Sequence, residues 1–392
     1  MPADTANPTN RVLLHVLFFL SGIATVLIGQ VLPILERHFS LNDLQLSFFF
    51  PVQFAGSLTG TFLTSRFARK DNYQAAATLG GVLMAIGILL MNVDNFSICL
   101  AGFLVNGLGV GLTLPAVNML ILEADPERSA SALSILNFCW GVGAIVSKPF
   151  VDLSSTAENI SVTTYLLAIP LVLTTVLLFF VNGRTRSTTV RVPVDDETGD
   201  VVIWLAPMAW GIALFNFIHV GFESGIGGWL TTYTTRVEGG TFLHWLSPTF
   251  LYFSFFVIGR GVAPLLFRFV SENRMILTGL LIILAGMLLM LTATSVALLG
   301  VGSLIAGFGT SWIFPTNVSR FFRVFGQAAN RRATPLFVCG TLGAAALTWV
   351  IGFISNATGS LRSGMYALVM CIGLLIILQL ILGRHQSLMI DR

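Results

Sequence analysis

The chain has 392 residues, of which 55% are hydrophobic and 10% are charged, and its mean hydropathy is +0.85. Soluble domains carry charge on about a quarter of their residues, so this composition excludes an ordinary soluble enzyme or binding module. The formal net charge of +3 says little about partners. The sequence has no basic face for nucleic acid, no phosphate-binding glycine loop and no His/Cys cluster spaced for a metal, so we expect no enzyme activity, cofactor or metal.

Apolar runs recur from one end of the chain to the other. Each is roughly 20 residues long, enough to cross a hydrocarbon core of about 30 Å as a helix. The alternating pattern of a transmembrane barrel is absent, and a helix satisfies its own backbone hydrogen bonds in lipid. The sequence therefore predicts an all-α membrane protein with twelve spans. In chain order they lie at about 11–35, 42–65, 74–93, 96–122, 129–153, 162–183, 201–233, 245–270, 275–293, 296–322, 333–356 and 364–384.

The basic residues fix the expected orientation. If the N-terminus is inside, the cytoplasmic segments hold sixteen of the 21 Lys and Arg, and the outer loops hold three, Arg37, Arg236 and Arg362. Cytoplasmic loops of membrane proteins carry such an excess, so we expect both termini in the cytoplasm and a bacterial-type inner membrane. The cytoplasmic set is Arg11, Arg66, Arg69, Lys70, Arg128, Arg184, Arg186, Arg191, Arg268, Arg274, Arg320, Arg323, Arg331, Arg332, Arg384 and Arg392.

The spans fall into two halves that resemble each other at an offset of 200 residues. GLGVGLTLP at 107–115 lies over GFGTSWIFP at 307–315, and Cys139, Gly143 and Ala144 lie over Cys339, Gly343 and Ala344. Such parallel six-helix repeats are typical of carriers whose two bundles move around a midplane site. We expect an N-terminal bundle at 1–183, a cytoplasmic linker at 184–200 and a C-terminal bundle at 201–392.

These motifs resemble the major facilitator superfamily over essentially the whole chain. GFESGIGGW at 221–229 is similar to the seventh-span signature of the fucose–galactose–glucose/proton symporter family, and LGVGLTLPAVN, LNFCWGVGA and Gly259-Arg260 also suit that family. The resemblance implies two pseudo-symmetric six-helix bundles, alternating access and a carrier that works as a monomer.

Two features depart from the family pattern. GTFLTSRFARK, after span two, keeps Gly60, Arg66, Arg69 and Lys70 of the cytoplasmic gate motif, but Thr64 stands where an aspartate is expected. Sugar/proton members also use carboxylates in spans one and four, and neither span has an acid here before Glu36 and Glu123. The usual proton carrier therefore cannot be transferred by resemblance.

Glu223 and His219 form the leading candidate site. A charge inside a span is costly unless it faces water or a partner. The two residues are four apart in span seven and hence on one helix face. Such a pair can load and release a proton near neutral pH. We expect a role in proton coupling or gating; the alternative is that Glu223 only ties the outer end of span seven to a neighbour.

Two cations also lie within spans. Lys148 in span five has three alternatives: pairing with Glu223 or Asp152, snorkelling to the interface, or holding an anionic substrate. Arg260 in span eight resembles a structural arginine at the cytoplasmic gate. Arg320 and Arg323, at the end of span ten, are interpreted as inner-interface anchors.

Several uncharged polar and aromatic side chains complete the candidate substrate site. An amide in a span needs a neighbouring helix or a ligand hydroxyl as its partner, and an indole can stack on the apolar face of a sugar. For any single amide the helix–helix tie is the commoner case. The predicted substrate-binding residues are Lys148, Asn137, Trp140, Gln30, Asn118, Asn317, Trp229 and Trp312.

The sequence thus predicts a secondary transporter that moves a small hydrophilic solute, most simply a sugar or related polyol, by proton-coupled alternating access. The expected partners are that solute, protons and membrane lipid. One alternative is a carrier or exporter of an organic anion, with Lys148 as the counter-charge. Another is a membrane receptor or scaffold that transports nothing, although the chain has almost no soluble loops.

Overall fold

The computed structural model describes residues 8–68, 72–124, 129–182, 203–238, 246–326 and 332–390, and these are almost entirely helical. The first-half helices are α1 (Pro8–Phe39), α2 (Asp43–Ser47), α3 (Phe49–Ala68), α4 (Tyr73–Leu90), α5 (Phe96–Ala124), α6 (Ser129–Ser154) and α7 (Ser161–Asn182). After the 3-10 turn η1 (Ile203–Leu205) come α8 (Pro207–Glu238), α9 (Pro248–Leu266), α10 (Glu272–Thr292), α11 (Val296–Thr310), α12 (Ile313–Phe325), α14 (Thr334–Thr358) and α15 (Leu361–Ile390).

The prediction of an all-helical membrane protein is confirmed. Within the described residues, eleven segments are long and apolar enough to cross a membrane. The predicted seventh span corresponds to α8, a helix of 32 residues that is long enough but is not among those eleven. Its sequence includes Asn216, His219 and Glu223, which lower its hydropathy. The predicted linker at 184–200 lies outside the described residues.

Two of the predicted spans are interrupted. The second consists of the short α2 and the long α3, which meet at Phe48, and the tenth consists of α11 and α12, separated at Ser311 and Trp312. A break in a spanning helix frees backbone carbonyls that other groups must satisfy. The Ser311 carbonyl at the second break accepts a hydrogen bond from Arg260, and α2, before the first break, begins with Asp43.

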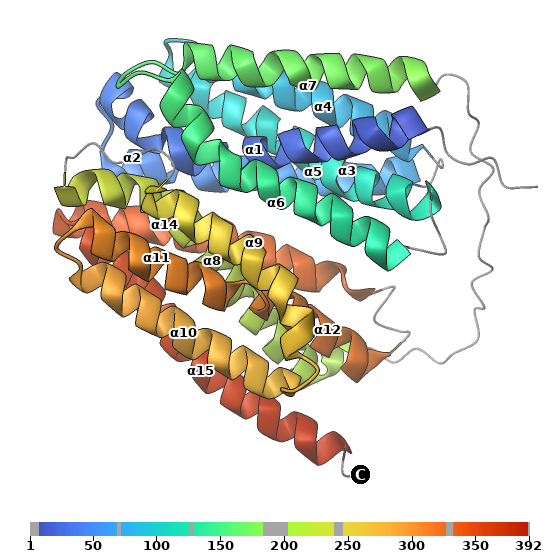
Figure 1. The fold of residues 1–392 in the computed structure, drawn as a ribbon, viewed down its shortest axis with the longest axis vertical. Coiled ribbons are helices and arrows are strands. Elements are labelled where there is room, and N and C mark those ends of the chain that lie inside the picture. The colour runs from blue at the N-terminus through green and yellow to red at the C-terminus, as the bar shows by residue number, and fades with distance from the viewer. Residues whose placement is uncertain are drawn as a thin grey trace, which may run out of the picture. The chain divides into compact units, whose positions relative to one another are not determined.

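The chain divides into two compact units. Unit 1 comprises Met1–Leu41 and Phe48–Val192, and unit 2 comprises Asn42–Ser47 and Pro193–Arg392. In Figure 1 the helices of unit 1 run from blue to green, apart from α2, and most of those of unit 2 from yellow to red.

The main helix pairs of unit 1 are α3 with α5, α4 with α5 and α1 with α6. Those of unit 2 are α9 with α11, α10 with α11 and α8 with α14. Each unit-1 pair has its counterpart in unit 2.

The repeated glycines explain why these pairs correspond. A Cβ on Gly107 would collide with the carbonyl oxygen of Gln53 in α3, and one on Gly307 with that of Tyr252 in α9. A Cβ on Gly143 would likewise collide with the backbone of α1, and one on Gly343 with that of α8. Glycine lets two helices approach to backbone contact, so residues matched at the offset of 200 serve matching interfaces.

Arg320 was predicted to be an interface anchor, but its side chain is buried among other helices. Only 1% of it is exposed, and its guanidinium donates to Asn273 Oδ1 at 3.1 Å and to Gln379 Oε1 at 2.7 Å. These bonds join α12 to α10 and α15. Arg320 lies in α12, the last part of its predicted span, and the amides that bond it come from segments distant in the sequence. Arg323, by contrast, is half exposed and forms an ion pair with Glu272.

Candidate functional site

Glu223 and His219 lie one turn apart on α8, within unit 2. His219 Nε2 is 3.9 Å from Glu223 Oε2, which is too long for a hydrogen bond. The imidazole is completely buried, and neither of its nitrogens has a hydrogen-bond partner in the described part of the chain. The Glu223 side chain is 26% exposed. A partly exposed carboxyl group therefore lies next to an unbonded imidazole.

Arg260 on α9 supplies the counter-charge for this pair. Its guanidinium interacts electrostatically with Glu223, with His219 and with Tyr252. Its Nε donates to the carbonyl oxygen of Ser311 at 3.4 Å, and its guanidinium carbon lies 4.1 Å from the centre of the Phe256 ring. Ser311 is at the break between α11 and α12, so Arg260 connects the α8 carboxylate to the interruption in span ten.

Tyr252 is a member of the cluster that the sequence analysis missed. It is completely buried, and its hydroxyl lies near the side chain of Thr310. Its ring stacks on Phe256, with the ring centres 6.2 Å apart. Tyr252, Phe256 and Arg260 recur every four residues and hence lie on one face of α9. That spacing around a charged residue was the signal available in the sequence.

The amides of unit 2 serve as ties between helices. The Asn216 side chain donates to Leu336 O at 2.9 Å, joining α8 to the N-terminal end of α14. Asn317 donates to Ile212 O at 3.2 Å, joining α12 to α8. The side-chain oxygens of both have no hydrogen-bond partner within the described segments. Asn317, predicted to bind substrate, is completely buried.

The two tryptophans of unit 2 that were predicted to bind substrate, Trp229 and Trp312, pack between helices. Trp229 donates from Nε1 to Thr348 O at 2.9 Å, and Trp312 donates to Met275 O at 2.8 Å. Both side chains are almost entirely buried. The Trp229 indole thus connects α8 to α14. The Trp312 indole connects the break in span ten to α10.

In unit 1, Lys148 forms an ion pair with Asp152 one turn further along α6. This is one of the partners expected from the sequence. The two side chains are 13% and 21% exposed, respectively. The lysine charge is therefore already balanced within its own helix.

The other predicted residues of unit 1 are dispersed over three helices. Asn137 is exposed on α6, and Trp140 on the same helix has a buried indole nitrogen with no hydrogen bond in the described residues. Asn118 on α5 and Asn137 each donate to a carbonyl one turn earlier in their own helix, both at 2.8 Å. Gln30 on α1 is only 2% exposed. Asn137 and Trp140, three residues apart, share one face of α6.

The predicted gate motif ends α3. Thr64, where an aspartate was expected, donates to Gly60 O at 3.0 Å and lies 3.3 Å from Gly111 O in α5. A Cβ on Gly60 would collide with Leu108 O, so α3 and α5 make close backbone contact there. Arg66 is in the last turn of α3, whereas Arg69 and Lys70 lie outside the described residues. No group of three metal-ligating side chains occurs in the described segments.

The model of the family described as the Major Facilitator Superfamily matches residues 14–345. The chain belongs to this family. Its members are carriers rather than enzymes, so this protein is a multi-pass membrane transporter. The assignment agrees with the all-helical fold and with the repeated helix pairing of the two units.

Among characterised proteins, the chain is 22% identical over 359 residues to the glucose/mannose transporter GlcP of Bacillus subtilis (strain 168), covering 87% of each chain. A solved D-xylose-proton symporter aligns with a TM-score of 0.77, 16% identity and coverage of 95% of this chain and 96% of the other. FucP in its outward conformation aligns with a TM-score of 0.62, 19% identity and coverage of 95% and 98%. A peptide transporter shares the fold as well, so the fold alone does not select the solute.

Proposed function

We propose that this protein carries a sugar or related polyol across the inner membrane, with both termini in the cytoplasm, by proton-coupled alternating access of the two units. The observation that carries the proposal is Glu223. It is an acid within the helix that corresponds to span seven, it is 26% exposed, and it lies beside buried His219 and the charge of Arg260. Ionisable groups in spans mark ion pathways because their burial is otherwise costly.

Proton binding at Glu223 would change the forces on Arg260. While Glu223 is ionised, it balances the arginine charge. Once it is protonated, the contacts that Arg260 keeps with the described residues include the neutral Ser311 O and Phe256 ring. Removing one charge from a buried pair leaves the other uncompensated. The protonation state of α8 is thus coupled to the interruption between α11 and α12, a natural position for a helix to bend.

A neutral solute is favoured over an anion for two reasons. The related GlcP is a glucose/mannose transporter, and Lys148, the cation proposed to hold an anion, is paired with Asp152. Asn137 and Trp140 on one face of α6 offer amide and indole groups of the kind that bind sugar hydroxyls and sugar rings. The predicted residues Gln30 and Asn118 remain candidates for the same role.

The test separates proton coupling from solute binding. Purified protein in liposomes is assayed with glucose, mannose, xylose and fucose in two ways: accumulation driven by a proton gradient, and counterflow, the exchange of labelled for unlabelled solute without a gradient. We expect E223Q to lose accumulation and to retain counterflow. The matched control is E158Q, a change at an exposed acid outside the spans, which should retain both.

Accumulation by E223Q equal to wild type would overturn the role of Glu223. The organic-anion alternative makes a different prediction in the same assay. It requires transport of sugar acids but not of neutral sugars, and a loss of that transport in K148Q.

A further inference from the structure

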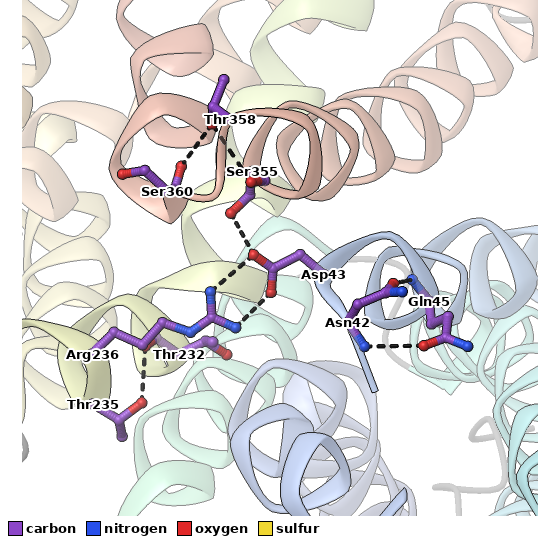
Figure 2. Close-up of polar contacts among 9 residues, drawn as sticks. All are labelled: Asn42, Asp43, Gln45, Thr232, Thr235, Arg236, Ser355, Thr358 and Ser360. Atoms are coloured by element: carbon purple, nitrogen blue, oxygen red, sulfur yellow. Dashed lines mark hydrogen bonds and ion pairs between the residues drawn. The ribbon is translucent and has the colours of Figure 1, made fainter. Parts of the chain in front are cut away.

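A short segment of the first half of the chain is part of unit 2. Residues Asn42–Ser47, here called the strap, contain α2 and pack against α14. Asp43 in the strap accepts two hydrogen bonds from the guanidinium of Arg236, at 2.9 Å and 2.5 Å, and one from the hydroxyl of Ser355. Figure 2 shows the three side chains converging from α2, α8 and α14.

The strap has a fixed local conformation and packs closely on α14. Asn42 and Gln45 exchange hydrogen bonds, each side-chain oxygen accepting from the other residue's backbone N–H, at 2.9 Å and 3.0 Å. This reciprocal cap fixes the start of α2 (Figure 2). A Cβ on Gly352 of α14 would collide with Ser47 and lie 2.6 Å from Asp43 O. Glycine at 352 therefore lets the strap rest directly on α14, where Asp43 is 8% exposed and Ser47 is fully buried.

The strap is covalently continuous with unit 1 on both sides, at Leu41 and at Phe48. Its contacts with α8 and α14 therefore hold a segment that the chain connects directly to unit 1. The predicted orientation places these contacts at the outer end, because Arg236 and the end of α1 belong to outer segments. A movement of α1 and α3 relative to unit 2 would pull on the strap through the chain on either side of it.

We propose that the strap is the outer latch of the transporter: the Asp43–Arg236–Ser355 cluster holds it on unit 2 in one state and releases it when the carrier opens outward. The proposal rests on the alternating access proposed above. The bidentate pairing of a carboxylate with a guanidinium gives the latch a defined geometry. The Arg236 side chain is 31% exposed and that of Asp43 10%, so water can replace the bonds as the ions separate.

The test measures the accessibility of Thr232, a buried residue on α8 one turn before Arg236. A single cysteine is introduced as T232C in a chain whose native Cys99, Cys139, Cys339 and Cys371 are replaced. Intact cells are treated with a membrane-impermeant thiol reagent, and the labelling rate is measured. We expect D43N to label several-fold faster than the chain with native Asp43. S355A should give an intermediate rate, because the pair with Arg236 remains.

The charge-swapped variant D43R/R236D should return the labelling rate toward that of the native latch. The matched control is D94N, which breaks the exposed His38–Asp94 pair in unit 1 and should leave the rate unchanged. An unchanged rate in D43N would overturn the latch, and so would fast labelling in the swapped variant. Because labelling needs no solute, a carrier that moves no sugar but shows the expected rates would refute the proposed substrate and leave the latch intact.

Discussion

Arg260 interacts with a carboxylate, a backbone carbonyl and an aromatic ring, and these contacts involve α8, α9 and the break in span ten. The charge pair with Glu223 predicts a non-additive effect on stability. R260Q leaves Glu223 without its counter-charge and should cost about 2 kcal/mol, less than the ~3–5 kcal/mol of a fully buried pair because the Glu223 side chain is 26% exposed. In E223Q/R260Q neither charge remains, so this variant should be more stable than R260Q alone.

Thermal unfolding in detergent, monitored by the loss of the monodisperse protein, measures this difference. Phe256, which lies under the guanidinium, offers a matched control: F256L removes the cation–π contact and leaves the charge pair in place. A double variant no more stable than R260Q would show that the two charges are not coupled.

For single residues, the sequence predicted only those side-chain contacts that are made within one helix. The four-residue spacing of His219 and Glu223, and of Lys148 and Asp152, placed each pair on one face, and both pairs are adjacent in the structure. Arg260 could not be assigned to Glu223, because their contact depends on how α9 packs in unit 2. For the same reason, nothing in the sequence showed that Trp229 would tie to α14, more than 100 residues away.

For the packing of helices, the repeated glycines lead to the same prediction in both units. G107A and G307A each place a methyl group against the carbonyl of a neighbouring helix, at Gln53 and Tyr252 respectively. Overpacking of this kind costs about 1–3 kcal/mol, so both variants should lower the unfolding temperature. Gly261 in α9 is the control, because a Cβ there meets nothing within 4 Å. G261A should be neutral or slightly stabilising, and equal losses in all three would refute the packing argument.

The helices themselves were the most predictable level of the structure, since a run of apolar residues is visible without any neighbour. The interruptions of the second and tenth spans could not be predicted in this way. Ser311 and Trp312 read as part of one continuous tenth span, yet the helix breaks there, with Trp312 bonded to α10 and the Ser311 carbonyl bonded to Arg260. The strap, likewise, read as the start of span two, and its place in unit 2 depends on Gly352 and Arg236 far along the chain.

Over the whole molecule, the two units share their helix pairing but not their charged groups. In unit 1 the ion pair of Lys148 and Asp152 lies within α6, whereas in unit 2 Glu223 and Arg260 join α8 to α9. A charge pair within one helix moves as a rigid body, and one between helices responds to their separation. This asymmetry agrees with the proposal that Glu223 in unit 2 couples protons and that Asn137 and Trp140 in unit 1 bind the solute.

The distribution of basic residues predicts how the whole chain sits in the membrane. Glu158, between α6 and α7, should face outward, and Phe269, which is 87% exposed between α9 and α10, should face the cytoplasm. In the cysteine-free chain, E158C should react with an impermeant thiol reagent on intact cells. F269C should react only after the cells are opened, because the reagent does not cross the bilayer. The reverse pattern would invert the predicted orientation, and it would place the strap and its Asp43–Arg236 contact at the cytoplasmic end of the carrier.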